Sequence, residues 1–354
     1  MNRKIIWMVV SGLMALSLVM AACGPAEEEV GGEIVEEEVV EAEVPKYGGT
    51  LSMKWTWVNN VGEEAWDIVN YSTAWGFRVW GAPFFPTLLI GDIEKYGPRG
   101  SNASPFEAFS VIPEQFVGGS MAESWEISPE RIIFHIRPGV HFSGREDVME
   151  AREFTAYDAE FSLNRTMTSY TASGKGAYEY IESITATDKY TLVVETNSYN
   201  ADWSFHLGYG WMAPIIPEEV VKAGPNNWRN HSGTGPFIIT DHVDGVQATY
   251  ERNPNYWEKT TIDGKEYQLP FIDRLVNPVI VDTSTRVAAL RTGKIDWDIA
   301  IPFEFSASLA AENPDLIQKK YETWPTSMSL PVDKEPWNNR NVRRALMIGT
   351  DWET

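Results

Sequence analysis

A single cysteine limits the ways in which this chain can be held together. Cys23 is the only cysteine among 354 residues, so no disulfide can form within the chain. It follows an almost uncharged apolar run, residues 5–22, which is itself preceded by Arg3 and Lys4. A positively charged start followed by an apolar run is typical of an export signal. We therefore expect a folded body that lies outside the cytoplasm and is stabilised by apolar burial rather than by disulfides.

The residues around Cys23 resemble the bacterial lipobox, in which the cysteine is lipidated and becomes the new N-terminus. Two alanines precede it and a glycine follows it. Met20 departs from the motif, which usually has Leu, Val or Ile there. The resemblance predicts a lipoprotein signal peptide at 1–22 and a lipid anchor on Cys23. A retained transmembrane anchor is the alternative, because an apolar run of this length can just span a bilayer.

A strongly acidic stretch follows the cysteine. Residues 24–45 contain nine glutamates, no basic residue and no aromatic residue. Like charges repel, and such a stretch cannot bury enough apolar surface to offset the entropy lost on ordering. We predict a disordered acidic tether at 23–46 and a folded body that begins near Tyr47. A metal-binding acidic strip is the alternative, although the sequence specifies no ligand geometry for it.

The chain as a whole is also acidic, with a formal net charge of -21. Nucleic-acid binding requires concentrated Lys and Arg, and the sequence contains no basic cluster. Nucleic acid is therefore excluded as a partner. The length of 354 residues predicts two compact domains.

Strand-like runs alternate with turns and a few helical segments in the body of the chain. Thr155 is a candidate helix N-cap with Asp158 three residues later, and Ala159, Phe161 and Leu163 are predicted to face the core. The mixture of elements predicts a two-lobed α/β protein. Strands are predicted at 48–57 and 189–197, a strand, turn and second strand at 131–142, a helix at 155–167, and a helix ended by Gly293 and then a strand at 283–300.

No catalytic motif is evident in the sequence. The nucleophile motif G-x-S-x-G does not occur, and the five histidines have no metal-ligand spacing. Asp296 and Asp298 lie two residues apart, on one face of a predicted strand, as a paired-carboxylate site would require. The alternative is that they form the solvated face of a strand whose other face carries Ile295, Trp297 and Ile299. We expect no metal, no cofactor and no enzymatic activity.

The glycines at 233–236, "GTGP", suggest a phosphate-binding loop but lack its chemistry. Pro236 has no backbone N–H, no lysine follows, and the chain continues into a predicted strand rather than a helix. We predict instead a tight backbone turn at the entry to a sheet.

Eight stretches occur in an order, spacing and content that resemble one family. They are YGGTL (47–51), MAESWEISPERIIFHIRPGVHFS (121–143), EFTAYDAEFSLNR (153–165), SGTGPFII (232–239), ERNPNYW (251–257), PFIDRLV (270–276), RVAALRTGKIDWDIA (286–300) and PWNNRNVRRALMIGTDWE (336–353). They resemble the extracytoplasmic solute-binding proteins of ABC importers, and within these family 5, which carries peptides, nickel and some oligosaccharides. One such stretch is a weak signal, but eight in the same order are specific.

The resemblance implies an α/β fold of the periplasmic-binding-protein type (class II), a two-lobed flytrap with an extra small domain. The lobes of such a protein close around a solute by hinge motion. It implies a discontinuous first lobe at 47–71 and 232–323, an inserted domain at 72–231 and the start of a second lobe at 324–354. Because family members continue well beyond the motif at which this chain stops, we expect a truncated chain that lacks most of the second lobe.

Five residues are candidates for contact with a solute. In the family the first strand and the loop after it line the cleft, which points to Trp55, Trp57 and Asn59. The aromatic segment 206–214 adds Tyr209 and Trp211. Aromatic rings stack on sugars and pack against peptide side chains, although core packing is the alternative for each tryptophan.

The resemblance implies that the protein binds a solute, a peptide by family membership, and delivers it to ABC permease subunits in the membrane. An oligosaccharide is the alternative cargo, because the chain contains 15 tryptophans. A hydrolase acting through the two aspartates and a receptor that presents the solute to a membrane sensor are further alternatives. We expect a monomer anchored by its lipid in the periplasm or at the outer face of the cell membrane.

Overall fold

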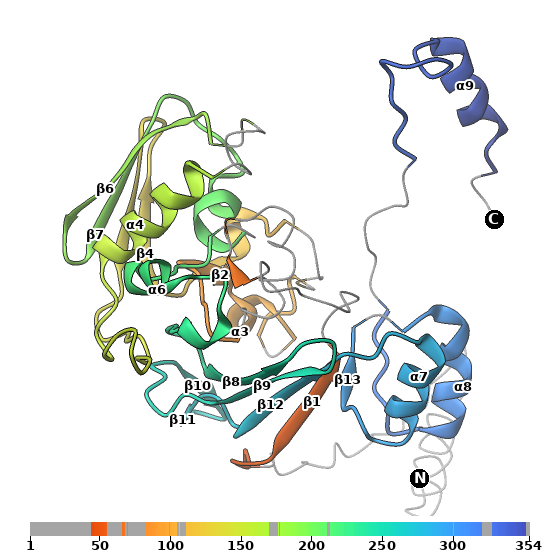
Figure 1. The fold of residues 1–354 in the computed structure, drawn as a ribbon, viewed down its shortest axis with the longest axis horizontal. Coiled ribbons are helices and arrows are strands. Elements are labelled where there is room, and N and C mark those ends of the chain that lie inside the picture. The colour runs from red at the N-terminus through yellow and green to blue at the C-terminus, as the bar shows by residue number, and fades with distance from the viewer. Residues whose placement is uncertain are drawn as a thin grey trace, which may run out of the picture. The chain divides into compact units, whose positions relative to one another are not determined.

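The structure of the protein, a computed structural model, places five strands from distant parts of the chain in one mixed sheet (Figure 1). The strand order is β13-β1-β12-β9-β8. β1 is parallel to both of its neighbours, whereas β9 is antiparallel to β12 and to β8. The strands are β1 (Thr50–Lys54), β8 (Phe237–Val243), β9 (Gln247–Arg252), β12 (Arg274–Pro278) and β13 (Trp297–Asp298).

The structure describes most of the chain after the acidic stretch. All of the described residues except Val44 belong to one compact unit, Pro45–Thr354. They are residues 44–54, 66–67, 69, 83–98, 100–104, 106, 111–169, 176, 178–210, 213–299, 301–320 and 328–351.

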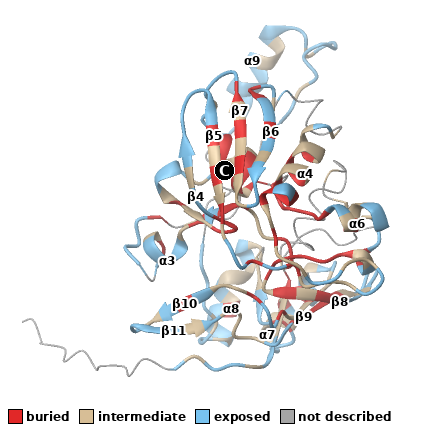
Figure 2. Ribbon diagram, turned by 90° about the vertical axis from the view of Figure 1, so that its left-hand side faces the viewer, coloured by how far each residue is buried: buried red, intermediate tan, exposed pale blue. Residues whose placement is uncertain are grey.

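A second sheet contains four antiparallel strands in the order β4-β5-β7-β6. Burial alternates along β5, where Ile132, Phe134 and Ile136 are buried and the residues between them are not. This period of two is the pattern of a strand with one face on a core. The helix α4 (Ala156–Met167) packs on β6 and β7, and Figure 2 shows buried residues along β5, β7 and α4. The strands are β4 (Ala122–Ile127), β5 (Arg131–Ile136), β6 (Ile181–Asp188) and β7 (Thr191–Thr196).

Two strand pairs and several short helices complete the described elements. The pairs are β2 (Leu89–Gly91) with β3 (Val117–Gly119), and β10 (Lys259–Ile262) with β11 (Lys265–Gln268). The α-helices are α3 (Ile93–Tyr96), α6 (Glu218–Ala223), α7 (Thr283–Arg291), α8 (Ser306–Glu312) and α9 (Arg340–Gly349). The 3-10 helices are η2 (Glu114–Phe116), η4 (Trp228–Asn230) and η5 (Phe303–Phe305), and η3 (Ser204–Tyr209) is a π-helix.

The helix predicted at 155–167 is confirmed as α4. Its first turn carries a capping box, in which the Thr155 backbone N–H donates to Asp158 Oδ2 at 2.9 Å. Ala159 and Leu163 are buried as predicted. The prediction for Phe161 is wrong, because this side chain is only half-buried. Two residues turn an α-helix by about 200°, so Phe161 cannot share the face of residues two positions away.

The prediction of a second strand after the turn at residues 138–139 is also wrong. The structure shows only an isolated bridge between His141 and Glu153. Both edges of β5 are already occupied, by β4 on one side and β7 on the other. The chain after the turn therefore has no free edge of β5 on which to form a hairpin.

The other predicted elements are present but shorter. The strand predicted at 48–57 is described as β1 up to Lys54, and its last residues lie outside the described part. The strand predicted at 189–197 is β7. In the segment 283–300, α7 ends at Arg291, Gly293 follows with φ +63°, and β13 has two residues.

The "GTGP" loop enters β8, as predicted, but for a different steric reason. Neither of its glycines has a positive φ. A Cβ atom on Gly233 would lie 1.8 Å from the carbonyl oxygen of Phe84, so the loop needs glycine for close backbone approach. Asn253 holds the loop from the other side by donating from Nδ2 to the Gly235 carbonyl at 2.9 Å. The loop is therefore a structural junction.

Among the residues that the structure describes, no helix has the length and apolar character needed to cross a bilayer. The apolar run at 5–22 and Cys23 lie outside these residues, so the signal peptide and the lipid anchor stay predictions. The predicted domain boundaries likewise stay predictions.

Candidate functional site

The carboxyl ends of three parallel strands meet at one edge of the five-stranded sheet, which we call the carboxyl edge. β1 pairs in parallel with β12 and with β13, and Lys54 is the register partner of Asp298. Antiparallel pairing brings the start of β9 and the end of β8 to the same edge. Pro278 of β12 is the register partner of Gln247, and Gln247 is the register partner of Val243. In open α/β sheets, ligands bind outside the carboxyl ends of the strands. The carboxyl edge is therefore the candidate site.

Three buried charged side chains lie at this edge: Lys54 from β1, Arg286 from α7 and Asp298 from β13. Lys54 is 1% exposed although it ends a strand. Arg286 Nε lies 2.8 Å from Asp298 Oδ2, and both side chains are buried. Removing one partner of a buried ion pair strongly destabilises the folded protein, because the other charge stays buried without compensation. These contacts join α7 to β13 beside the end of β1.

The charges of the three groups influence one another. Burial and, to a lesser extent, the positive charge of Arg286 lower the pKa of Lys54 to about 8, against the opposing effect of the Asp298 carboxylate. Lys54 therefore keeps its proton at neutral pH in most molecules. Lys54 was not among the predicted site residues, because it occupies a polar position of the alternating strand, in line with Thr50 and Ser52, and so looks like an exposed residue.

The paired-carboxylate hypothesis for Asp296 and Asp298 does not match the geometry. Asp296 Oδ2 accepts a hydrogen bond from the Ser52 backbone N–H at 2.7 Å, whereas Asp298 contacts Arg286. The two carboxylates thus have separate partners. The alternative of a solvated face is wrong for Asp298, whose side chain is 1% exposed. Trp297 between them is more exposed than the aspartate that follows it.

Most of the residues predicted to contact a solute lie outside the described part of the chain. This applies to Trp55, Trp57, Asn59 and Trp211. The first of them, Trp55, is the residue that follows Lys54 in the sequence.

Tyr209, at the end of η3, is described. Its hydroxyl accepts a hydrogen bond from the Ile112 backbone N–H at 2.8 Å and lies 3.1 Å from the Ile112 carbonyl. Its ring packs against the core of the four-stranded sheet, and burial raises the pKa of its hydroxyl. These contacts give Tyr209 a structural role, and solute contact through it stays a prediction.

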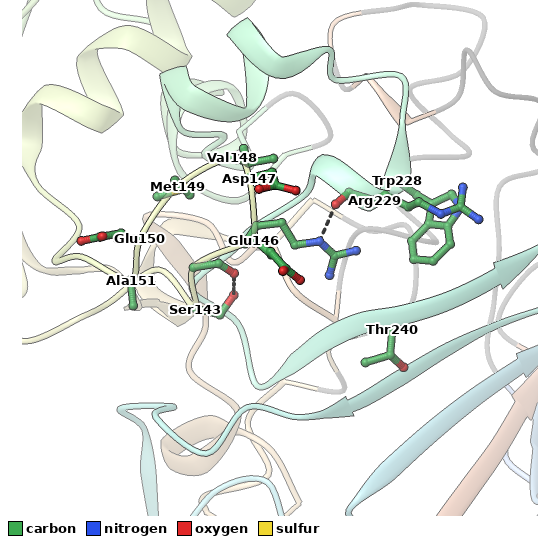
Figure 3. A pocket seen from close by; sticks show the side chains of 12 residues that line it. Ser143, Glu146, Asp147, Val148, Met149, Glu150, Ala151, Trp228, Arg229 and Thr240 are labelled. Atoms are coloured by element: carbon green, nitrogen blue, oxygen red, sulfur yellow. Dashed lines mark hydrogen bonds between the residues drawn. The ribbon is translucent and has the colours of Figure 1, made fainter.

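A surface hollow of about 1130 Å³ lies between the loop 143–151 and the residues Trp228, Arg229 and Thr240 (Figure 3). Arg145 crosses it, donating from Nε to the Arg229 carbonyl and from Nη1 to the Ile239 carbonyl at 3.0 Å. The Arg229 guanidinium stacks 4.5 Å from the centre of the Trp228 ring. Burial and the charge of Arg229 lower the pKa of Arg145. Arg145 thus fastens the loop to η4 and β8, and no residue of the carboxyl edge lines this hollow.

The histidines do not assemble a metal site in the described part of the chain, where no group of three or more His, Cys, Asp or Glu side chains could hold an ion. His231 is buried and its Nε2 lies 2.8 Å from the Pro225 carbonyl. His135 pairs with Glu126 at 3.0 Å on the surface of the four-stranded sheet. Both contacts are structural.

Comparison with known proteins identifies a family. Residues 117–354 match the model of the family described as bacterial extracellular solute-binding proteins, family 5 Middle. Heme-binding protein A of Haemophilus influenzae is 29% identical over 297 residues, which cover 76% of this chain and 51% of that protein. Di/tripeptide-binding protein 2 of Pseudomonas aeruginosa is 27% identical over 308 residues, which cover 81% of this chain and 52% of that protein. The chain thus spans about half the length of the curated relatives it matches.

A solved structure shows the same fold. The dipeptide-binding protein from Pseudoalteromonas sp. SM9913, in complex with Met-Leu, superposes with a TM-score of 0.61 at 20% identity. The match covers 86% of this chain and 57% of that protein. The predicted fold class, an α/β fold of the periplasmic-binding-protein type, is confirmed.

Proposed function

The chain belongs to the bacterial extracellular solute-binding proteins of family 5, and from this membership we propose that the whole protein binds a peptide outside the cytoplasm. It delivers the peptide to ABC permease subunits by hinge closure. The observation that carries the proposal is the family match over residues 117–354. In such a mechanism the ligand stabilises the closed form, which is the form that the permease recognises.

The carboxyl edge suits this role physically. The ion pair between Arg286 and Asp298 fastens α7 to β13, and β13 pairs with the end of β1, so these three elements form a rigid platform at the edge. A rigid platform loses little conformational entropy when a ligand binds, and this favours affinity. The predicted contact residues Trp55, Trp57 and Asn59 come soon after Lys54 in the sequence.

We further propose a lipoprotein that acts as a monomer. Residues 1–22 form the signal peptide, Cys23 carries the lipid, and 23–46 form the tether. The support is the sequence around the lone cysteine and the acidic run after it. Radiolabelled palmitate should enter the protein in a bacterial host and should be lost on Cys23→Ser. Equal labelling of both forms would contradict the proposal.

Ligand-dependent thermal unfolding tests peptide binding. The purified whole protein is heated with a mixture of di- to pentapeptides, and separately with a mixture of oligosaccharides. A ligand at about 100 times its Kd stabilises the folded state by about 2.7 kcal/mol, which raises Tm by several degrees. We expect a rise with peptides and none with sugars. A rise with sugars alone, or with neither mixture, would overturn the proposal.

A further inference from the structure

One buried side chain at the carboxyl edge lacks the hydrogen-bond partner that its chemistry requires. Asn277 lies in β12, one residue before the strand ends at Pro278, and it is 3% exposed. Within the part of the chain that the structure describes, no group donates a hydrogen bond to its Oδ1. Buried polar atoms are almost always hydrogen-bonded, because burying one without a partner costs free energy. The exception indicates a donor that comes from another molecule.

The pairing of the strands places Asn277 in a row of side chains that runs across the sheet at the carboxyl edge. Asn277 follows Val276, which is the register partner of Ser52, so it lies level with the next residue of β1, Met53. Met53 is in turn the register partner of Trp297 in β13. Side chains at the same level of paired strands point to the same face of a sheet. Trp297, Met53 and Asn277 therefore form one row on one face.

Exposure falls along this row from the outer strand of the sheet inward. Trp297 in β13 is 36% exposed, Met53 is half-buried, and Asn277 is 3% exposed. The neighbours of Asn277 on the same face, Ala248 of β9 and Leu275 of β12, are buried apolar residues. Ligand sites typically combine apolar and aromatic side chains with a few polar groups that fix orientation. The row has this composition, with the amide at its inner end.

A second buried amide, at the opposite end of the same sheet, has the partners that Asn277 lacks. Asn253 follows the end of β9 and is 2% exposed. Its Nδ2 donates to the Gly235 carbonyl at 2.9 Å, and its Oδ1 accepts from the Asn255 N–H at 3.0 Å. Asn253 thus has a structural role that its hydrogen bonds explain. Asn277 is buried to the same extent without such a role.

We propose that Asn277 accepts a hydrogen bond from a main-chain N–H of the bound peptide. The inference rests on the proposed peptide binding and assigns one residue of that site. Ligands of open α/β sheets bind outside the carboxyl ends of the strands, so a peptide brings its donors to the end of β12. The donor is a main-chain N–H because almost every residue of a peptide carries one, whereas only some side chains have a donor. Such a contact contributes affinity without selecting a sequence.

Isothermal titration calorimetry and urea unfolding of the purified whole protein together test this residue. The probes are dialanine, trialanine and trileucine. Asn277→Leu keeps the branched shape of the side chain and removes the acceptor. We expect it to raise the Kd of every probe that binds by about three- to tenfold, which corresponds to one neutral hydrogen bond. Its urea midpoint should not fall, because the substitution removes a buried polar atom that has no partner in the free protein.

Asn253→Leu is the matched control, because it replaces an equally buried amide that has partners within the chain. It should lower the urea midpoint and leave the Kd of the folded protein unchanged. Asn277→Ala is the second variant, because alanine is too small to block a peptide. It should raise the Kd of the same probes to a similar extent as Asn277→Leu.

The possible outcomes separate the residue from the proposed function. An unchanged Kd in both Asn277 variants means that the amide binds only water, which overturns the assignment and leaves peptide binding intact. A raised Kd in Asn277→Leu alone is a steric effect, and a raised Kd for one of several bound probes is a side-chain effect; each refutes a main-chain contact. A urea midpoint that falls as far in Asn277→Leu as in Asn253→Leu reveals a structural role instead. Binding of none of the probes by the unsubstituted protein overturns both the residue and the proposed function.

Discussion

Acid should destabilise the fold through His231, which is buried beside the five-stranded sheet. Its Nε2 lies 2.8 Å from the Pro225 carbonyl, and its ring packs against Phe84 and Phe85. Burial lowers the pKa of His231 from 6.5 to about 4. The hydrogen bond to Pro225 and the charge of Asp67 act in the opposite direction but do not reverse the shift.

The sign of the effect follows from proton binding. Between pH 6.5 and about pH 4, the unfolded chain binds a proton at His231 and the folded chain does not. The free energy of unfolding therefore rises with pH in this window and is lost as the pH falls. Linkage gives a loss of about 2 kcal/mol between about pH 7.5 and about pH 5, and about 3 kcal/mol below about pH 4.

Urea unfolding followed by tryptophan fluorescence measures this loss, since the chain contains 15 tryptophans. His231→Gln keeps a donor for the Pro225 carbonyl but does not titrate. Its loss of stability from about pH 7.5 to about pH 5 should be about 2 kcal/mol smaller than that of the unsubstituted protein. His141→Gln replaces an exposed histidine and should leave the loss unchanged. An equal loss in the unsubstituted protein and in His231→Gln would refute the reasoning.

Two further substitutions test the packing of the sheet. Gly233→Ala should lower the free energy of unfolding by about 1–3 kcal/mol, because the new Cβ would overlap the Phe84 carbonyl. The control Gly349→Ala should cost nothing, because a Cβ there meets no atom within 4 Å. Equal urea midpoints for the two variants would contradict this reasoning. Asp298→Asn should cost about 3–5 kcal/mol, because it leaves buried cations without their carboxylate. Lys54→Met should cost less stability in the same assay, because the ion pair between Asp298 and Arg286 remains. A larger loss for Lys54→Met than for Asp298→Asn would contradict the role given to the carboxylate.

The elements that could be predicted are those set by short stretches of sequence. The start of α4 depends on Thr155 and Asp158, which are three residues apart, so the sequence contains the whole capping box. The alternation along β7 likewise reports burial on one face without reference to other strands. The order of eight family motifs was sufficient to predict the fold class, which the family match and the structural superposition confirm.

The wrong predictions concern neighbours that are distant in sequence. The segment at 140–142 looks like the second strand of a hairpin, yet β7 occupies the edge of β5 that it would need. Asp298 alternates with apolar residues as a solvated strand would, yet α7 brings Arg286 over it and removes both from water. Neither outcome is visible in a local pattern, because each depends on which element packs alongside.

The sequence by itself determined the acidic character, the lone cysteine, the local caps and turns, and the membership that the family motifs indicate. Only the tertiary structure decided that Lys54, Arg286 and Asp298 meet at one edge of a sheet. The physical reason is that hydrogen-bond register between strands fixes these neighbours. Register in this sheet joins segments more than a hundred residues apart, as β1 and β12 do between Thr50 and Arg274.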